Sequence, residues 1–316
     1  MSAKATERTR LLEKINEIDK ISDREWKTEL AERKLKELEF HDRDRDQSRI
    51  EKTISSDTYE KYHGNKKYYL ATRRSRQFVK DWIATESKDK VFLDYACGNG
   101  GTAIFAAQTG AELSLGFDIS GVSVKNARDA AAAAGLNDNI RFFQADAENT
   151  KLPDNSIDAI VCSGMLHHLD LSYAFPELRR ILKPGGKVLA VEALDYNPAI
   201  KVYRFLTPDM RTEWEKAHIL NLSDVKFGSR FFDVKEICYW YGLVMHPENF
   251  LGCSRYLTDL TLYWKRFHMS SVWHGSLHSS CINGDICEDM NDFWGEDTKN
   301  MSRASIQLGA ENAART

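Results

Sequence analysis

The chain has 316 residues, of which 42% are hydrophobic and 29% are charged, and its net charge is -3. This length predicts one or two domains with ordinary globular composition. The slight acidity and the lack of a basic stripe exclude the usual footprint of a nucleic-acid-binding protein, so we expect no nucleic-acid partner. No stretch approaches ~18 consecutive apolar residues, so we expect no membrane span. The six scattered cysteines and a first segment without an apolar core predict reduced thiols, no secretory signal and a cytoplasmic location.

The first segment, residues 1–52, is charged and carries only a thin apolar stripe. Apolar residues recur there at helical spacing, beginning with Leu11 and Ile15. Ser22 followed by Glu25 is typical of a capping box and predicts a second helix that begins directly after Ser22. We therefore expect a charged helical extension folded as a hairpin. One interpretation is that the charged surface of this hairpin is simply solvated. The other is that the hairpin packs over the core as a lid or as a dimer arm, and a dimer arm would give a homodimer through these helices.

Between about residues 90 and 192, short β-rich runs alternate with helical segments. This alternation predicts βαβ units and an α/β fold with a Rossmann-like, doubly wound, mostly parallel sheet. Ligands bind such sheets at the carboxyl ends of the strands. The strand candidates are residues 90–94, 113–118, 140–146, 157–163 and 187–193.

Residues 53–280 are expected to form one domain, which follows the helical extension. A long connection near 195–230 is expected to cover the substrate, since long loops above a cleft commonly carry specificity. Residues 281–316 are expected to be a polar tail whose last part is disordered, because they have almost no apolar periodicity. The other elements expected in this half are a helix at 222–232, a strand at 234–245, a helix at 255–267 and a last strand at 270–280.

The stretch LDYACGNGG at 93–101 places an acid, Asp94, before a cluster of three glycines. Asp118 ends the second candidate strand and Asp146 the third. A ribose-binding acid is expected about 20 residues past a glycine loop, which fits Asp118, and its carboxylate can accept hydrogen bonds from both ribose hydroxyls. The glycines allow backbone N–H groups and a helix N-terminus to approach a ligand closely.

The loop alone leaves several interpretations open. GNGGTA at 98–103 also fits a dinucleotide fingerprint, which would indicate an NAD(P)-dependent oxidoreductase. Asp94 would repel a pyrophosphate, however, and would attract a cationic ligand such as the sulfonium and ammonium groups of S-adenosylmethionine. A non-catalytic binding protein that keeps the fold as a scaffold is a third interpretation. Asp94 could also simply cap the helix that follows the loop.

The segments VFLDYACGNGG, LGFDIS, FFQADAENTKLPDNSIDAIVCSGMLHHL and LRRILKPGGKVLAVEAL follow one another between about residues 90 and 194. In this joint pattern the chain resembles class I S-adenosylmethionine-dependent methyltransferases of the small-molecule and ubiquinone-type branch. The resemblance implies a seven-stranded sheet whose last strand is antiparallel, and S-adenosyl-L-methionine as the cofactor. It implies methyl transfer to O, N or C of a small or mid-sized metabolite.

The resemblance also assigns parts of the cofactor to parts of the chain. The glycine loop would hold the methionine part, Asp118 the ribose, and Asp146 the border of the adenine. The family usually has glycine where this chain has Ala96, so the extra methyl group is expected to tighten that turn. The cofactor-binding residues expected in this way are Asp94, Ala96, Gly98, Gly100, Asp118, Ile119, Asp146, Ala147 and Ser163.

Two residues are candidates for catalysis. His167 belongs to the paired histidines His167 and His168 that follow the fourth strand, and Glu192 ends the fifth strand. Either could act as a base, which methyl transfer needs only when the acceptor must lose a proton. A structural role for the histidine pair is the alternative.

Substrate contacts are expected from the long connection, with Tyr203, Arg204, Arg211 and His218 as the candidates. Arg204 and Arg211 could hold a carboxylate or a phosphate, or they could form surface salt bridges with nearby acids such as Glu215. No metal site is expected, because HGSLHSSC at 274–281 lacks a C-x-x-C pair and its histidines fit a strand pattern.

Overall fold

The computed structural model describes residues 3–46, 73–195, 201, 204–205, 212–240 and 303–309. The helix expected at 255–267 and the last strand expected at 270–280 lie outside these ranges, as do Tyr203 and Arg211. Within the described part of the chain, no helix is both long and apolar enough to cross a membrane.

Five parallel strands form the centre of the sheet, and they confirm the five strand candidates. They are β1 (Val91–Tyr95), β2 (Leu113–Asp118), β3 (Ile140–Gln144), β4 (Ile157–Ser163) and β5 (Leu182–Glu192). Their order is β3-β2-β1-β4-β5, with every adjacent pair parallel. The order changes direction between β1 and β4, which is where ligands bind in doubly wound sheets.

Two more strands extend the sheet beyond β5. β7 (Arg303–Gly309) pairs antiparallel with β5, and β6 (Asp233–Trp240) pairs antiparallel with β7. β6 lies within the strand expected at 234–245, apart from one residue at its start. β7 lies in the segment expected to be a disordered tail, so the structure differs from that expectation. Ala304, Ile306 and Leu308 alternate with polar residues, and this short period-2 pattern is the signal for the strand.

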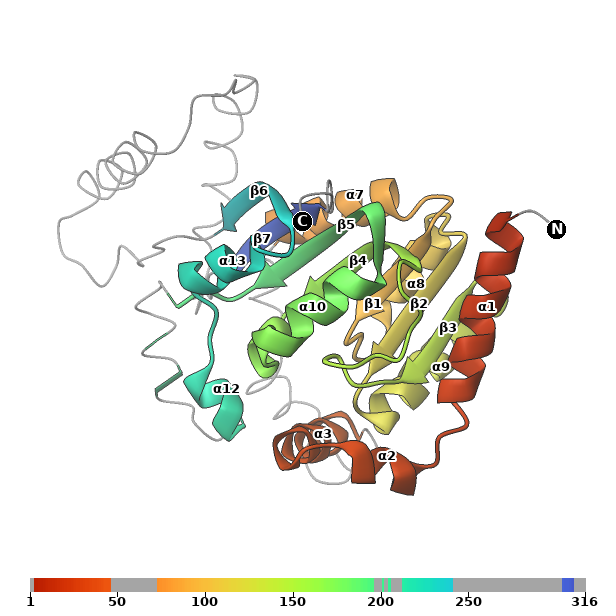
Figure 1. The fold of residues 1–316 in the computed structure, drawn as a ribbon, viewed down its shortest axis with the longest axis horizontal. Coiled ribbons are helices and arrows are strands. Elements are labelled where there is room, and N and C mark those ends of the chain that lie inside the picture. Colours follow the sequence, from red (N-terminus) through yellow and green to blue (C-terminus); the bar gives the residue numbers. More distant parts are fainter. Residues whose placement is uncertain are drawn as a thin grey trace, which may run out of the picture.

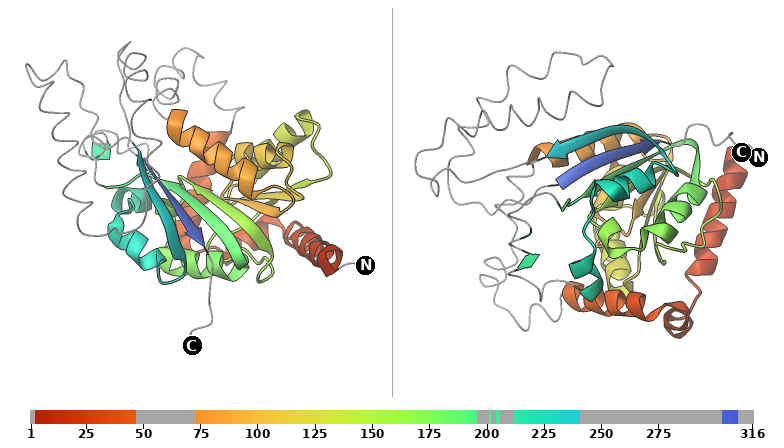
Figure 2. Two further views of the ribbon diagram at one scale, coloured as in Figure 1. Left: turned by 90° about the horizontal axis from the view of Figure 1, so that it is seen from above. Right: turned by 60° about the vertical axis from the view of Figure 1, so that its left-hand side comes forward.

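Helices cover both faces of the sheet. α7 (Arg73–Glu86) and α8 (Gly101–Gln108) pack on one face, against Phe92 and Val161. α9 (Gly121–Ala133) packs beside α8, against Phe142 of β3. α10 (Leu171–Ile181), α13 (Leu222–Gly228) and α1 (Ala3–Ile18) pack on the opposite face. Figure 2 shows α7 and α10 on opposite sides of the sheet.

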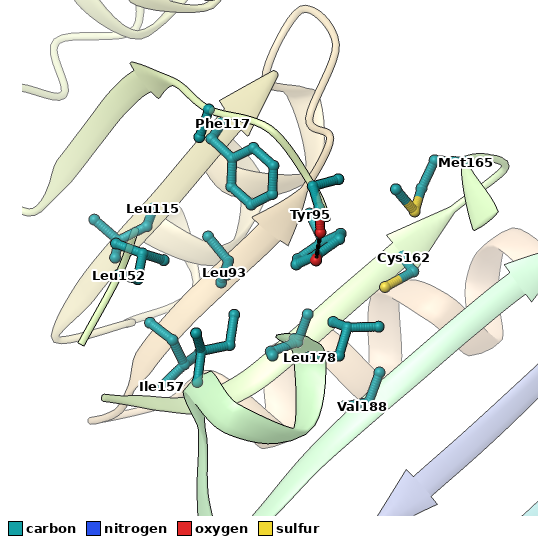
Figure 3. Close-up of a cluster of buried hydrophobic side chains, with 14 of the residues drawn as sticks. Leu93, Tyr95, Leu115, Phe117, Leu152, Ile157, Cys162, Met165, Leu178 and Val188 are labelled. Carbon is teal, nitrogen blue, oxygen red and sulfur yellow. Dashed lines mark hydrogen bonds between the residues drawn. The ribbon is translucent and has the colours of Figure 1, made fainter. Parts of the chain in front are cut away.

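The larger core lies on the face covered by α10 (Figure 3). Leu93 and Tyr95 point to this side while Phe92 points to the other, as the period-2 geometry of a strand requires. All three side chains are fully buried. The Tyr95 hydroxyl donates a hydrogen bond to the carbonyl of Ala147, which ties β1 to the loop after β3.

The N-terminal segment contains α1, α2 (Asp23–Glu29) and α3 (Glu32–Arg45). The capping box predicted at Ser22 and Glu25 is confirmed, with both of its hydrogen bonds present. The expected second helix is divided in two near Leu30. Leu11 and Ile15 are buried in the larger core, so the apolar stripe is part of the main fold. α2 and α3 lie at the edge of the sheet where the strands end (Figure 1).

Candidate cofactor site

A cavity of about 310 Å³ lies at the carboxyl ends of the strands, and residues of α3 form one of its walls. Its volume is near the lower end of the range for small-molecule sites. Among the nine expected cofactor residues, Gly100 does not line the cavity. The other eight do: Asp94, Ala96, Gly98, Asp118, Ile119, Asp146, Ala147 and Ser163. The sequence therefore located the strand-side wall of the cavity.

Asp94 is 3% exposed, and its Oδ2 accepts a hydrogen bond from the N–H of Ala103 at 3.2 Å. It therefore caps α8, which is the capping alternative, and it also lines the cavity. Burial raises the pKa of Asp94 to about 7; the N–H of Ala103 opposes the shift, and the nearby Asp118 adds to it. A carboxyl with this pKa is half-ionised near neutral pH and would be drawn to the charged form by a cationic ligand.

The loop after β1 is wound tightly. Ala96 has φ 56, a left-handed conformation that costs a residue with a Cβ atom about 1 kcal/mol or more. This strain appears at the position expected to tighten the turn. Gly98 has φ 54, and its N–H donates to Asp118 Oδ2 at 2.8 Å.

Gly100 has a packing role in this structure. A Cβ atom at this position would lie 2.7 Å from Cβ of Ala127 on α9 and 2.7 Å from the ring of Phe142. The residue is also the N-cap of α8 and has φ 79. Glycine is therefore required there because the start of α8 lies against α9 and β3, whatever the ligand.

Asp118 accepts three hydrogen bonds at the cavity wall. Its Oδ1 accepts from the N–H of Ser120 at 3.0 Å, while Oδ2 accepts from Gly98 and, at 3.1 Å, from Nη1 of Arg45. Arg45 is the last residue of α3 and also donates to the Ser123 hydroxyl at 2.6 Å. The predicted ribose acid thus lies in the cavity and is paired with a cation from the N-terminal segment.

A second ion-pair group lies at the other end of α3. Lys34 Nζ is 2.6 Å from Asp146 Oδ2 and 2.8 Å from Glu148 Oε2. Arg33 pairs with Glu148 and donates to the carbonyl of His168 at 2.9 Å. Lys34, Asp146 and Glu148 form a half-buried charge network, and it fastens α3 over the region predicted to border the adenine.

The predicted catalytic pair is buried beside the cavity instead of lining it. Glu192 is fully buried; its Oε1 accepts from the N–H groups of Met165 and Leu166, each at 2.8 Å. Its Oε2 lies 2.9 Å from Nδ1 of His167. Burial opposes the charged imidazole, but the bond to Glu192 outweighs it and raises the pKa of His167. The geometry favours a positioning role for both, in which Glu192 holds the turn after β4.

The neighbouring histidine does line the cavity. His168 belongs to the 3₁₀ turn η1 (Leu166–His168), and its Nδ1 is 3.1 Å from Oε2 of Glu37 on α3. His41, one turn further along α3, stacks edge-on against His168 with ring centroids 5.2 Å apart. Two histidines and a carboxylate therefore form one part of the cavity wall.

The substrate candidates in the described part of the long connection do not line the cavity. Arg204 pairs with Glu215 at 3.5 Å, which is the salt-bridge alternative. His218 is exposed and stacks on Trp214 with ring centroids 3.7 Å apart. Both residues are near α12 (Glu213–Ala217). α12 is linked to α3, because Thr212 donates to Glu37 and the Arg33 guanidinium lies 4.3 Å from the Trp214 ring. The right panel of Figure 2 shows these two helices close together.

Sequence reasoning offered a lid over the core as one interpretation of the N-terminal helices, but it named none of the α3 residues at the cavity. These residues are Arg33, Lys34, Glu37, His41 and Arg45. Their spacing of three or four residues is that of one helix face, so a polar stripe was visible in the sequence. What it faces could not be read there, because its partners lie far along the chain in the loops that follow the strands.

Acids from the ends of neighbouring parallel strands, gathered around one cavity, define a Rossmann-like cofactor site. Residues 93–190 match the family model described as a methyltransferase domain. This part of the chain is a class I methyltransferase domain, whose cofactor is S-adenosylmethionine.

Three relatives illustrate the similarity. The chain is 39% identical over 103 residues to the ubiquinone/menaquinone biosynthesis C-methyltransferase of Idiomarina loihiensis, a match covering 32% of this chain and 41% of that protein. It is 33% identical over 119 residues to the 27-O-demethylrifamycin SV methyltransferase of Amycolatopsis mediterranei, covering 37% and 43%. It is 30% identical over 131 residues to the ribosomal protein L11 methyltransferase of Photobacterium profundum, covering 40% and 43%. The match thus spans less than half the length of each relative, and the acceptors in their names differ.

Proposed function

We propose that this chain transfers a methyl group from S-adenosylmethionine to O, N or C of a small or mid-sized metabolite. The observation that carries the proposal is that Asp94, Asp118 and Asp146 surround one cavity within the methyltransferase domain. The names of the quinone and rifamycin relatives support a metabolite acceptor, with C and O as the atoms methylated.

The residues present fit this cofactor. Asp118 offers carboxylate oxygens for ribose hydroxyls, although Arg45 already occupies one of its acceptor positions. Asp94 offers a carboxyl group whose ionised form would be stabilised by a sulfonium or ammonium group nearby. Ile119 and Ala147 add apolar surface to the wall, as a ligand with an aromatic base requires. A pyrophosphate would meet a cavity lined by five acidic and three cationic side chains, so the oxidoreductase alternative is not favoured.

When bound, the cofactor supplies an electrophilic methyl group on a positively charged sulfur. In the proposed reaction, a bond forms between the acceptor atom and the methyl carbon while the carbon–sulfur bond breaks, leaving S-adenosylhomocysteine. The chain must hold the acceptor about 3 Å from that carbon and keep water away. Ser163, the last residue of β4, and His168 both lie at the cavity wall, and Glu192 fixes the turn between them.

The segments over the cavity have the proposed role of a substrate cover. α3 closes the cavity, and α12 of the long connection packs against α3. The homodimer through the N-terminal helices stays a hypothesis. The apolar stripe of these helices, at Leu11 and Ile15, is already buried within this chain, so a dimer would have to use their other faces. The cytoplasmic location, the exclusion of nucleic acid and the assignment of residues 53–280 to one domain likewise stay predictions.

The function is tested by incubating the chain with metabolite extracts and S-adenosylmethionine labelled at the methyl group. Mass spectrometry should identify a product that carries the label, and the product names the acceptor. Binding of NAD(P) in place of S-adenosylmethionine would favour the oxidoreductase. Tight cofactor binding without a labelled product from any extract would favour the scaffold.

Cofactor affinity should rise with pH because of Asp94. The ionised carboxylate binds a cationic ligand better than the neutral acid does, and the pKa of Asp94 lies at about 7. About a tenth of these carboxyls are ionised at pH ~6 and about nine tenths at pH ~8, so we expect roughly tenfold tighter binding at the higher pH. Calorimetry across this range measures the change. Asp94→Asn should show only the titration of the cofactor itself, and identical pH profiles would contradict the role of Asp94.

Replacing Arg45 should tighten cofactor binding. Its Nη1 competes with a ribose hydroxyl for Asp118 Oδ2, and its charge opposes a cationic ligand. Freeing one charged acceptor is worth about 1 kcal/mol, so we expect Arg45→Ala to lower the dissociation constant roughly fivefold. Calorimetry at fixed pH and salt concentration measures it. Arg43→Ala, an exposed arginine of the same helix, is the matched control. Weaker binding by Arg45→Ala would mean that Arg45 holds the ligand instead of competing with it.

A further inference from the structure

Glu37, His41 and His168 bring three ligand-type atoms together at the wall of the cavity. Glu37 Oε2 is 3.1 Å from His168 Nδ1 and 3.7 Å from His41 Nε2. All three ligand atoms lie within 4.8 Å of one another. Glu37 and His41 are one helical turn apart on α3, while His168 comes from η1, so the group bridges the cover and the sheet.

These distances are close to those of a coordinated ion. Metal–ligand bonds of about 2.0–2.2 Å around a tetrahedral ion place neighbouring ligand atoms about 3.4 Å apart. The distances from Glu37 Oε2 to the two histidine nitrogens, 3.1 Å and 3.7 Å, lie just below and just above this value. A bound ion would take the place of the hydrogen bond between His168 Nδ1 and Glu37 Oε2.

The ligand orientation is supported from outside the group. The Thr212 hydroxyl donates to Glu37 Oε1, which leaves Oε2 directed to the two histidines. The guanidinium of Arg33 holds the backbone carbonyl of His168 at 2.9 Å. Outer hydrogen bonds of this kind fix the rotamers of metal ligands.

The charges nearby allow a cation. Arg33 pairs with Glu148, Lys34 with Asp146 and Glu148, and Arg45 with Asp118. Within the described residues, no lysine or arginine pairs with Glu37, whose ion-pair partners are the two histidines. Glu37 is 5% exposed, so the charge of its carboxylate is shielded from bulk water.

We propose that Glu37, His41 and His168 bind a divalent transition-metal ion at the cavity wall. Two imidazoles and one carboxylate suit zinc, iron, cobalt or manganese better than magnesium or calcium. Three protein ligands leave coordination positions open, which is the arrangement of catalytic metal sites, and here the open side faces the cavity. The expectation of no metal concerned the histidines at 274–281. It did not consider this group, whose carboxylate and His168 are 131 residues apart and have no motif spacing.

The ion would also narrow the acceptor class, and this extension rests on the proposed function. A metal at this wall takes an oxygen donor of the acceptor, such as a hydroxyl or a carboxylate, and lowers the pKa of a bound hydroxyl. A hydroxyl acceptor would then release its proton to water, and its oxygen would take the methyl group without a side-chain base.

The experiment titrates the metal-free 316-residue chain with Co²⁺ and follows the visible absorption of the ion. Wild type should bind one Co²⁺ with a tetrahedral or five-coordinate spectrum. Glu37→Gln and His168→Gln should each weaken that binding by at least about tenfold. Glu39→Gln, an exposed glutamate on the same helix, should bind Co²⁺ as wild type does.

Circular dichroism and cofactor calorimetry on each variant separate loss of the site from loss of the fold. Equal Co²⁺ binding by wild type and both ligand variants, or no Co²⁺ binding by wild type, would overturn the metal proposal. In either case, cofactor affinity and label transfer would be unaffected, so the proposed function would stand. If the chain binds Co²⁺ but gives no labelled product, the metal proposal would stand and the proposed function would fail.

Discussion

Asp118→Ala is expected to raise the dissociation constant for S-adenosylmethionine about a hundredfold or more, since two hydrogen bonds to a charged acceptor are worth about 3 kcal/mol together. The loss has two sources. The ribose hydroxyls lose their acceptor, and the N–H groups of Gly98 and Ser120 lose the oxygens that hold the loop in place.

Asp118→Asn separates these sources. The amide keeps the shape and one acceptor oxygen, so its affinity should lie between those of wild type and Asp118→Ala. Asp129→Ala, an exposed acid on α9 paired with Lys125, serves as the control and should leave affinity unchanged. Calorimetry measures all four proteins. Wild-type affinity in Asp118→Ala would remove this residue from the cofactor site.

Glu192→Ala is expected to cost about 3–5 kcal/mol of unfolding free energy, the usual cost of removing one partner of a buried charged pair. The change leaves the N–H groups of Met165 and Leu166 and the ring of His167 without their acceptor. Urea denaturation measures the loss. A change below about 1 kcal/mol would mean that water or a neighbouring group replaces the carboxylate.

The same pair predicts a pH dependence. The pKa of His167 is raised in the folded chain, so the stability it contributes is complete below its unfolded value of about 6.5. That contribution is lost as the pH rises through the raised value. In Glu192→Gln the imidazole loses its anionic partner, and this part of the pH dependence should disappear. Denaturation curves at several pH values above ~6, compared between wild type and variant, isolate it from other titrating groups.

The sequence predicted those parts of the molecule that depend on local pattern. Five strands, the capping box at Ser22 and the acids at the strand ends all follow from spacing within a few residues. The class of the domain followed from the same segments. Each of these signals is read within one element or one loop, where propensity and periodicity act directly.

The residues that were misplaced depend on tertiary structure. Glu192 ends a strand, like Asp118, but it points to the backbone of the turn after β4 and is sealed from the cavity. His167 and His168 are adjacent in sequence, yet only His168 reaches the cavity, because the 3₁₀ turn directs the two side chains differently. Arg45 was treated as part of a charge run, although it pairs with Asp118 across 73 residues of chain. Long-range pairing of this kind has no local signature.

The burial of the N-terminal apolar stripe shows that the N-terminal helices belong to the same folding unit as the sheet. Leu11, Ile15 and Trp26 belong to the same core as the strands, so α1, α2 and the sheet should melt together in one cooperative transition. A chain shortened to begin at residue 73 would expose the apolar face that these helices cover. The unit that folds is therefore larger than the stretch at 93–190 that carries the family's pattern. We therefore expect the ligand to exchange by local opening of the cover, and not by these helices swinging away as a separate body.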